Sequence, residues 1–174
     1  SYIVLRQIEW LLWTSAQEGE RTSLGEYLVF LLNPFTLLAG PIARFEDVSA
    51  YLRTNQEPLS GGALLDACER VVNGYLKLAV LAPLLHQVSG FELVGRLGHR
   101  MPAFLTVLYS RPLYIYFDFS GYTDVVIGLA AIAGLRLPEN FNHPFRSANV
   151  QEFWTRWHIS FSSWARDFVF YPLL

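Results

Sequence analysis

Residues Tyr116–Tyr171 read YFDFSGYTDVVIGLAAIAGLRLPENFNHPFRSANVQEFWTRWHISFSSWARDFVFY and constrain the architecture more than any other segment. They place carboxylates, a histidine, arginines and three tryptophans within and beside long apolar runs. Apolar surroundings exclude such groups, because burying a charge without a partner costs several kcal/mol or more. The segment therefore raises two questions: which environment surrounds the chain, and what chemistry His158 performs.

The composition favours a membrane protein. Hydrophobic residues make up 52% of the 174 positions and charged residues 16%, whereas soluble domains carry roughly 25% charged residues. The mean hydropathy of +0.27 leaves room for polar loops. The net charge of −2 gives no basic excess and excludes a nucleic-acid partner. The single cysteine, Cys68, excludes an internal disulfide, and we expect it to pack as a small apolar side chain.

We predict an all-α fold, a polytopic membrane helical bundle with kinked or re-entrant segments. No repeat, low-complexity tract or linker divides residues 1–174, so we expect a single partial membrane domain. The chain starts at Ser1 without a visible signal peptide and stops within apolar sequence at Leu174. We therefore expect an internal piece of a larger protein.

In the first half of the chain, apolar residues recur at helical spacing over residues 1–13 and predict a helix. Tyr27–Ala43 carries no charge over 17 residues, which is at the short end of what spans a bilayer. Asn33–Pro34 and Gly40–Pro41 interrupt it, so a kinked or re-entrant element is as consistent with the pattern as a straight span. Residues 44–70 are rich in charge and predict a connector.

In the second half, a helix is predicted from about Ala63 to Leu85, with a kink or exit at Pro83. The longer apolar run Pro102–Ile132 predicts another helix, which Gly134 ends. Leu137–Pro144 is predicted to be an extended loop, because residues before proline avoid the α region.

Polar side chains follow one face of the predicted helix over residues 102–132: Arg111, Tyr114, Asp118 and Tyr122. In a soluble protein such a seam locks helices together, whereas intramembrane ionisable groups face a site or a water-filled cavity. Gly121 and Gly128 lie seven residues apart on one face and predict the close approach of another helix.

A last helix is predicted from Asn149, which can cap it with Glu152 as the capping-box partner. Glu152 and Arg156 can also pair at i, i+4. Steps of three and four residues then place polar side chains along one face: Gln151, Thr155, His158, Ser162 and Arg166. Two interpretations of His158 stay open: a core histidine with satisfied nitrogens, or a group that orients a hydroxyl or takes its proton.

The sequence contains no nucleophile elbow, no glycine-rich phosphate loop and no His/Cys cluster at metal spacing. It therefore supports neither covalent nor metal catalysis, and we expect no bound cofactor.

Four ordered blocks of the sequence resemble the membrane-bound O-acyltransferase family, in its bacterial branch that acetylates alginate and transfers D-alanine to teichoic acid. The blocks are LLAGPIARFEDV at residues 37–48, YFDFSGYTDVVIGLA at 116–130, LRLPENFNHPF at 135–145 and EFWTRWHISFSSWARDFVFYPL at 152–173. Residues 1–36 and 49–110 match in helical character only.

The resemblance implies a multi-pass protein of the cell inner membrane, in which an acyl group, expected to be an acetyl group, passes through a tunnel to a hydroxyl acceptor on a cell-surface polysaccharide. His158 matches the first of the family's two important histidines and is the expected catalytic residue of this chain. The second lies further along in the family, and no histidine follows His158 here. We expect truncation to account for that difference, and an inactive remnant of the acyltransferase is the alternative.

The resemblance also implies the surroundings of His158 and its substrates. The residues expected to line the substrate tunnel are Asp118, Tyr122, Asn142, Trp154, Arg156 and Trp157. Acetyl-CoA or an acyl carrier is the expected acyl donor, and a polysaccharide or another hydroxyl compound is the expected acceptor. The acceptor is reached directly or through an extracytoplasmic partner acyltransferase, and membrane lipids surround the protein.

Two other classes of function remain open from the residues. A transporter or channel would use Arg111, Asp118 and Asp124 as a hydrophilic path, with a broken helix at Asn33–Pro34. A soluble helical domain with a very apolar core is the other, although Tyr27–Ala43 and the low charge content argue against it.

Overall fold

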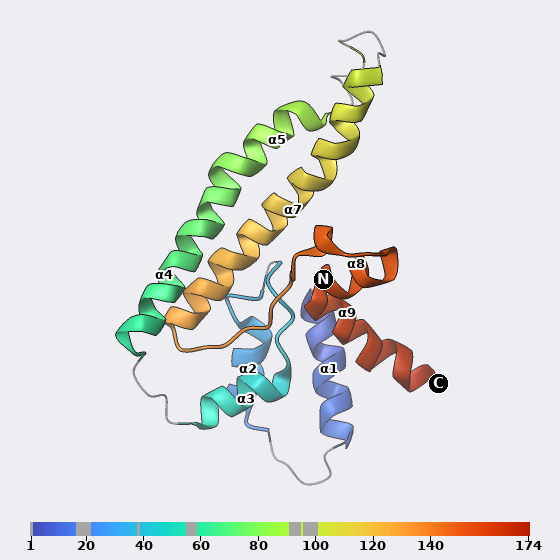
Figure 1. Cartoon of the computed structure of the whole chain (residues 1–174). Coiled ribbons are helices and arrows are strands. Elements are labelled where there is room, and N and C mark those ends of the chain that lie inside the picture. The colour runs from blue at the N-terminus through green and yellow to red at the C-terminus, as the bar shows by residue number, and fades with distance from the viewer. Residues whose placement is uncertain (1, 17–21, 38, 55–58, 91–94, 96–100) are drawn as a thin grey trace.

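The computed structural model describes residues 2–16, 22–37, 39–54, 59–90, 95 and 101–174. Within these ranges the chain is helical and forms no strand, which confirms the predicted all-α class (Figure 1). The α-helices, in chain order, are α1 Tyr2–Ala16, α2 Leu24–Leu32, α3 Phe45–Arg53, α4 Gly61–Leu76, α5 Ala82–Ser89, α7 Met101–Ile132, α8 Val150–Arg156 and α9 Ile159–Ala165.

A long helical hairpin dominates the molecule (Figure 1). Its first arm, Gly61–Ser89, joins α4 and α5 through the π-helical turn Lys77–Leu81, and its second arm is α7. Both arms are long and apolar enough to cross a membrane. At 1.5 Å per residue α7 is about 48 Å long, more than the roughly 30 Å of a hydrocarbon core.

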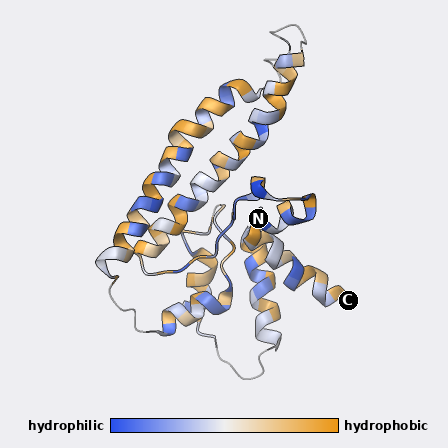
Figure 2. Ribbon diagram, in the orientation of Figure 1, coloured by the Kyte–Doolittle hydropathy of each residue, from blue (hydrophilic) through white to orange (hydrophobic). Residues whose placement is uncertain are grey.

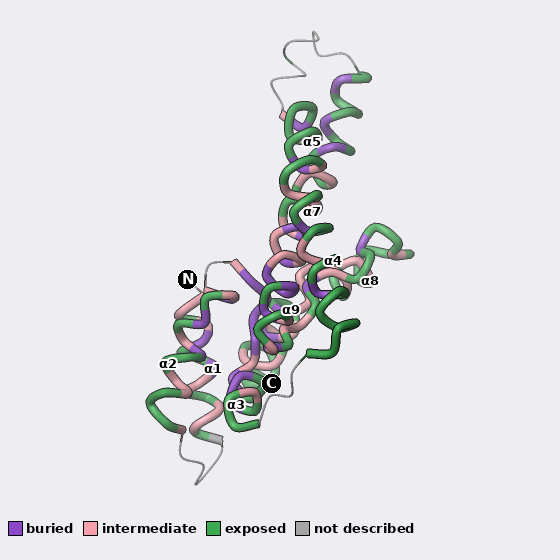
Figure 3. Tube along the Cα trace, turned by 90° about the vertical axis from the view of Figure 1, so that its left-hand side faces the viewer, coloured by how far each residue is buried: buried purple, intermediate pink, exposed green. Residues whose placement is uncertain are grey.

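The apolar surface of the hairpin is mostly open to its surroundings. Only 11% of the most apolar window of Gly61–Ser89 is buried, and 39% of that of Met101–Ile132. Hydrophobic residues cover much of both arms in Figure 2, and Figure 3 shows exposed residues along α5 and, alternating with buried ones, at the N-terminal end of α7. This distribution fits helices whose outer faces meet lipid or further helices.

Glycines bring the two arms of the hairpin together, as the spacing of Gly121 and Gly128 predicts. A Cβ built on Gly121 would lie 2.9 Å from the carbonyl oxygen of Gly74 on α4, and one on Gly128 would lie 2.6 Å from Cγ2 of Val71. A Cβ on Gly74 would lie 2.7 Å from the Gly121 carbonyl oxygen in return. The backbones therefore approach more closely than any side chain permits.

The ends of the two arms differ in how well sequence predicted them. α7 ends as predicted, since Gly134 has a φ of 83°. Its N–H donates to the Ala131 carbonyl while Leu135 N–H donates to the Ala130 carbonyl, which is the Schellman pattern. The first arm, however, does not exit at Pro83 but continues to Ser89. Proline has no backbone N–H to donate within a helix, and the π-helical turn Lys77–Leu81 before Pro83 is the kind of irregularity that this causes.

The segment Tyr27–Ala43 is interrupted rather than a straight span. α2 ends at Leu32, a turn follows at Asn33, and the chain is extended before α3. Buried Arg6 on α1 donates to the carbonyl oxygens of Phe30, at 3.2 Å, and Leu31, at 2.7 Å. These bonds satisfy carbonyls that the end of the helix leaves without intrahelical donors.

The prediction that residues 44–70 form a connector is wrong, because α3 occupies Phe45–Arg53. Phe45 and Val48 are buried and pack with Phe30 and Ala43 in a small core, while Glu46 and the other charges of α3 lie outside. The charges on the outer face concealed this apolar periodicity.

Cys68 on α4 is exposed, which contradicts its predicted packing role. The sequence also predicts polar loops over Thr14–Arg21 and Gln87–Arg100, and residues 17–21, 91–94 and 96–100 of these stretches lie outside the described residues.

Glu9 links α1 to the start of α3. Its Oε1 accepts a hydrogen bond of 2.7 Å from the Phe45 backbone N–H, while Oε2 is buried and finds no partner in the described part of the chain. The side chain is almost fully buried. Burial raises the pKa of the Glu9 carboxyl to about 7, in spite of the Phe45 hydrogen bond and the nearby Arg44 charge, which lower it.

The close approach of α4 and α7 predicts a sharp contrast between two glycines of α4. Gly74→Ala should destabilise the protein by about 1–3 kcal/mol, because the new methyl meets the α7 backbone. Gly62→Ala should be neutral or stabilising, since a Cβ there meets nothing within 4 Å. Thermal unfolding in detergent measures both, and equal stability of the two variants would contradict this packing.

The raised pKa of Glu9 predicts a stability that falls as pH rises from about 5 to about 8. The folded state holds the Glu9 proton up to a pKa of about 7, whereas the unfolded chain releases it near 4.5. The folded state therefore binds more protons in this window, and its stability declines across it by at most on the order of 3 kcal/mol. Glu9→Gln keeps the acceptor for Phe45 N–H and should flatten the dependence. An unchanged pH profile in that variant would contradict the assignment.

Candidate functional site

The segment around His158 is not the continuous helix that the sequence pattern predicts. α8 ends at Arg156 and α9 begins at Ile159, so the predicted polar stripe through His158 does not exist on one helix face. Gln151 and Thr155 belong to α8, before the break. The predicted cap of α8 is confirmed, because the Asn149 side chain accepts from Glu152 N–H at 2.8 Å. The Glu152 carboxylate, however, accepts from Ala148 N–H rather than from Asn149 N–H.

The helix breaks because the extended loop before α8 pairs with the residues between α8 and α9. Asn142 N–H donates to the Arg156 carbonyl and Ile159 N–H donates to the Asn140 carbonyl, each at 3.0 Å. Phe141 and Trp157 form an isolated antiparallel bridge between these two bonds. This short ladder holds the chain in an extended conformation at Trp157, where a helix would otherwise continue.

His158 adopts a left-handed backbone conformation, with φ 46° and ψ 53°. Residues with a side chain avoid this region, since it costs roughly 1–2 kcal/mol relative to a right-handed conformation. Here the conformation turns the chain into α9, whose first turn forms when Ser162 N–H donates to the His158 carbonyl at 3.1 Å. Backbone strain of this kind gathers at functional sites, where the surrounding structure maintains it.

The His158 imidazole lies between two phenylalanines. The Phe119 ring of α7 meets it edge to face with centroids 4.9 Å apart, and the Phe161 ring of α9 stacks on it at 5.3 Å. Nε2 is buried and has no hydrogen-bond partner among the described residues. Burial lowers the pKa of the imidazole, so it is neutral near pH 7. A neutral imidazole with a free nitrogen can bind or deprotonate a hydroxyl.

Hydrogen bonds of Asn140 and Ser160 hold the turn at His158 in place. The buried Ser160 hydroxyl accepts from Ile42 N–H at 3.0 Å and donates to Asn140 Oδ1 at 2.5 Å. Its single oxygen therefore connects the extended segment before α3, the loop before α8, and α9. Removing it would leave two buried polar groups without partners.

Aromatic rings form a wall beside His158. Tyr116 of α7 contacts Phe141 at 5.5 Å and Trp157 at 6.1 Å between ring centroids, and Phe153 stacks on Trp157 at 5.4 Å. Phe145 joins them through Tyr116. The wall places apolar ring surface on this side of the site, and its member Phe145 is 49% exposed.

The structure brings three of the predicted site residues close to His158. Trp157 belongs to the aromatic wall, and Asn142 and Arg156 form the ladder with their backbones. The Asn142 side chain is exposed, while the Arg156 guanidinium pairs with Glu152 at 2.6 Å, as the i, i+4 spacing predicts. These contacts give Arg156 and Asn142 a positioning role in this structure.

The other predicted site residues point elsewhere. Trp154 is 57% exposed, and its ring contacts Phe153. Asp118 lines an open cavity of about 450 Å³ with His86 and Tyr114 on the α5 side of α7. Tyr122 lies close enough to Tyr2 of α1 to influence its pKa.

The predicted polar seam on α7 is a set of local contacts. The Arg111 guanidinium lies over the Tyr114 ring at 5.5 Å, and Tyr114 meets His86 edge to face at 5.0 Å. No ion pair joins Arg111 to Asp118 among the residues that the structure describes. Asp124 instead bonds to Arg70 at 3.0 Å and to Lys77 at 2.5 Å.

Sequence reasoning missed Phe119, Asn140 and Ser160. Asn140 lies two positions before Asn142, the residue that the sequence analysis chose for the site. Residues two apart in an extended chain lie on the same side of it, so the sequence alone does not show which of the two is buried. Ser160 was overlooked because it falls off the polar stripe of an unbroken helix. The position of Asn140 and Asn142 between Pro138 and Pro144, shortly before the aromatic residues of α8, was the sequence signal that could have indicated this loop.

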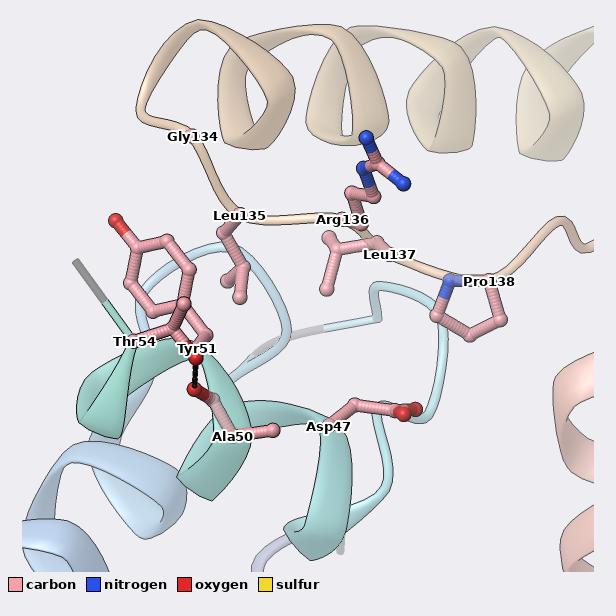
Figure 4. A pocket seen from close by; sticks show the side chains of 9 residues that line it. All are labelled: Asp47, Ala50, Tyr51, Thr54, Gly134, Leu135, Arg136, Leu137 and Pro138. Atoms are coloured by element: carbon pink, nitrogen blue, oxygen red, sulfur yellow. Dashed lines mark hydrogen bonds between the residues drawn. The ribbon is translucent and has the colours of Figure 1, made fainter. Parts of the chain in front are cut away.

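Another cavity lies apart from His158. It measures about 600 Å³ and lies between α3 and residues 134–138 (Figure 4). Asp47, Tyr51 and Arg136 are on its wall, and none of the predicted site residues lines it. No group of three or more His, Cys, Asp or Glu side chains in the described ranges could hold a metal ion.

Comparison with known proteins finds a family and several relatives. The sequence model of the membrane-bound O-acyltransferase family matches residues 4–174. The chain is 36% identical over 137 residues to a probable alginate O-acetylase of Pseudomonas fluorescens, covering 79% of this chain and 27% of that protein. It is 30% identical over 178 residues to a teichoic acid D-alanyltransferase of Bacillus subtilis (strain 168), covering 98% and 44%.

A third relative is a peptidoglycan O-acetyltransferase of Helicobacter pylori, 29% identical over 201 residues, with 99% of this chain and 38% of that protein covered. The chain thus spans between about a quarter and somewhat under half of the length of these curated relatives.

The bridging role of Ser160 predicts different effects for two serines of α9. Ser160→Ala should destabilise the protein by about 2–4 kcal/mol, because it leaves Ile42 N–H and Asn140 Oδ1 buried without partners. Ser163→Ala should cost less than about 1 kcal/mol, since the Ser163 hydroxyl donates only to the Ser160 carbonyl within α9. Thermal unfolding distinguishes them, and a Ser160→Ala protein as stable as Ser163→Ala would refute the bridge.

Proposed function

The chain belongs to the membrane-bound O-acyltransferase family, and from this premise we propose that the protein transfers an acyl group, an acetyl group in the simplest case, to a hydroxyl of a cell-surface polysaccharide. The observation that supports the proposal most directly is His158, whose strained backbone presents a neutral imidazole with an unpartnered, buried Nε2. The three relatives are named for different acceptors, and all three names describe acyl transfer to a surface polymer.

The reaction that fits this site is attack by an acceptor hydroxyl on an acyl carbonyl. The hydroxyl oxygen forms the new ester bond, and the bond between the acyl carbon and the sulfur of a thioester donor breaks to release a thiolate. The hydroxyl proton passes to a base and from there to this thiolate. The free Nε2 of His158 can hold the hydroxyl in line for attack or accept its proton. The family resemblance assigns His158 the supporting place in a histidine pair.

The aromatic wall contributes by excluding water from the reacting groups. Phe119, Phe161 and the wall around Tyr116 and Trp157 leave little polar surface beside the imidazole. Exclusion of water limits hydrolysis of the acyl donor and strengthens the hydrogen bond to the imidazole. Among the predicted tunnel residues, Trp157 has the contacts that this role requires.

The substrates, partners and location are part of the same proposal. The donor is acetyl-CoA or an acyl carrier, and the acceptor is reached directly or through an extracytoplasmic partner acyltransferase. The protein is a multi-pass component of the cell inner membrane, a location supported by the family's membrane-bound character and by the two long apolar helices.

His158→Ala in the full-length protein should reduce acyl transfer by about 10²–10⁴-fold, the range of a lost acid–base or positioning group, while leaving the protein folded in the membrane. His86→Ala serves as the matched control, because that ring packs on Tyr114 far along the hairpin. Product acylation is measured in membranes that carry each variant. Transfer at the wild-type rate by His158→Ala would refute the role of this residue.

The neutral state of His158 also predicts a pH profile. Since burial lowers the imidazole pKa below its ordinary value of 6.5, the rate should hold constant through neutral pH and fall only below 6.5. Protonation there removes the free lone pair of the ring. A rate that rises as pH falls through this range would contradict the assignment, and solute flux without an acyl donor would instead favour a transporter.

A further inference from the structure

A small cavity of about 150 Å³ lies between α7, the first arm of the hairpin and the loop before α8. Ser120 and Tyr116 of α7 line it, with Asn140 and Phe141 of the loop. A water molecule needs only about 10–15 Å³ of such space, and cavities of about this size in other proteins admit a six-membered ring. The space therefore exceeds what one structural water fills.

Two residues on the cavity wall have a buried polar atom without a partner. Ser120 is 3% exposed and Asn140 is 1% exposed, and neither Ser120 Oγ nor Asn140 Nδ2 makes a hydrogen bond within the part of the chain that the structure describes. The other end of the Asn140 amide is occupied, because Oδ1 accepts from Ser160. Buried polar atoms nearly always have partners, so these two indicate a ligand that supplies them.

The charged groups on the wall compensate one another. Lys77 pairs with Asp124 at 2.5 Å, and Arg70 pairs with Asp124 at 3.0 Å and with Glu139 at 2.5 Å. Two cations thus meet two carboxylates, and His143 on the rim is exposed. No uncompensated charge remains for a phosphate, a carboxylate or an ammonium group, so the ligand that fits is uncharged.

We propose that this cavity binds an uncharged, hydroxyl-bearing ring, a sugar unit of the acceptor. Asn140 Nδ2 donates to a ring or hydroxyl oxygen, and the Ser120 hydroxyl bonds to a neighbouring hydroxyl of the sugar. The rings of Tyr116 and Phe141 face its C–H surface. This inference rests on the proposed acyl transfer, whose acceptor it identifies as a neutral sugar.

The Phe119 ring links the cavity wall to His158. The Phe119 ring packs on Phe141, a wall residue, at 5.2 Å and on the His158 imidazole at 4.9 Å. Two rings, Phe141 on the cavity wall and Phe119 behind it, therefore separate a sugar unit held in the cavity from the imidazole. A neighbouring unit of the same polymer can then approach Nε2.

The test measures sugar binding to the purified full-length protein by saturation-transfer NMR, with N-acetylglucosamine as the uncharged probe and glucosamine and glucuronate as charged probes. The wild type should bind N-acetylglucosamine in preference to both charged probes. Ser120→Ala should weaken that binding roughly tenfold, the effect of one hydrogen bond to the ligand. It should not unfold the protein, because the Ser120 hydroxyl has no partner within it.

Thr106→Val is the matched control, since that hydroxyl lies on the same helix, bonds only to the Pro102 carbonyl and is outside the cavity. It should bind the probe as the wild type does. Asn140→Asp, which keeps Oδ1 for Ser160 and removes the donor, should weaken binding as Ser120→Ala does. Equal binding by wild type and Ser120→Ala, or no binding by either, would overturn the proposal and leave the cavity to water.

The same measurement on His158→Ala separates this inference from the proposed function. Binding of N-acetylglucosamine should persist in His158→Ala, because the imidazole does not line the cavity. If His158→Ala transfers acyl groups normally, the proposed role of His158 fails while the sugar site stands. If His158→Ala is inactive but Ser120→Ala binds the sugar normally, the sugar site alone fails.

Discussion

The hydrogen bonds through the Ser160 hydroxyl are the contacts on which the site depends. One oxygen accepts from Ile42 N–H and donates to Asn140 Oδ1, so it joins three segments that are far apart in the sequence. Each of those groups is buried, and a buried polar group without a partner costs about 1–3 kcal/mol. Loss of the hydroxyl would therefore remove the link between the loop before α8 and the segment that leads into α3, while the bond from Ile159 N–H of α9 to the Asn140 carbonyl would remain.

The strain at His158 follows from this attachment. With the loop held in place, Asn140 and Asn142 pair with the backbone on either side of Trp157, and the helix must end at Arg156. The left-handed turn at His158 is then the way for the chain to start α9. The ladder bonds, each of about 1 kcal/mol net, offset the cost of that turn. The imidazole consequently lies at the corner between α8 and α9, where its Nε2 forms no hydrogen bond with the described residues.

Local patterns in the sequence predicted the parts of the fold that depend on local contacts. The length of α7, its end at Gly134 and the close contacts of Gly121 and Gly128 follow from hydropathy and glycine spacing, and all three are present. The break before α9 was not predictable in this way, because the bonds that cause it come from residues about 15 to 20 positions earlier. α3 was missed for a different reason, since its outer charges concealed the apolar spacing of Phe45 and Val48. For the site, the family resemblance selected His158 and its blocks, but only the packing distinguished buried Asn140 from exposed Asn142.

Asn140 connects the cavity to His158 more directly than any aromatic contact does. Its carbonyl accepts from Ile159 and its Oδ1 accepts from Ser160, while the residue lines the cavity and its Nδ2 has no partner among the described residues. Two of these three groups maintain the turn at His158, and the third is free for a ligand. A ligand that bonds to Nδ2 holds the amide in the orientation that Ser160 requires, because rotating the amide would break both contacts. The proposed binding in the cavity would therefore be coupled to the position of the imidazole through one side chain, Asn140, without movement of the helical hairpin.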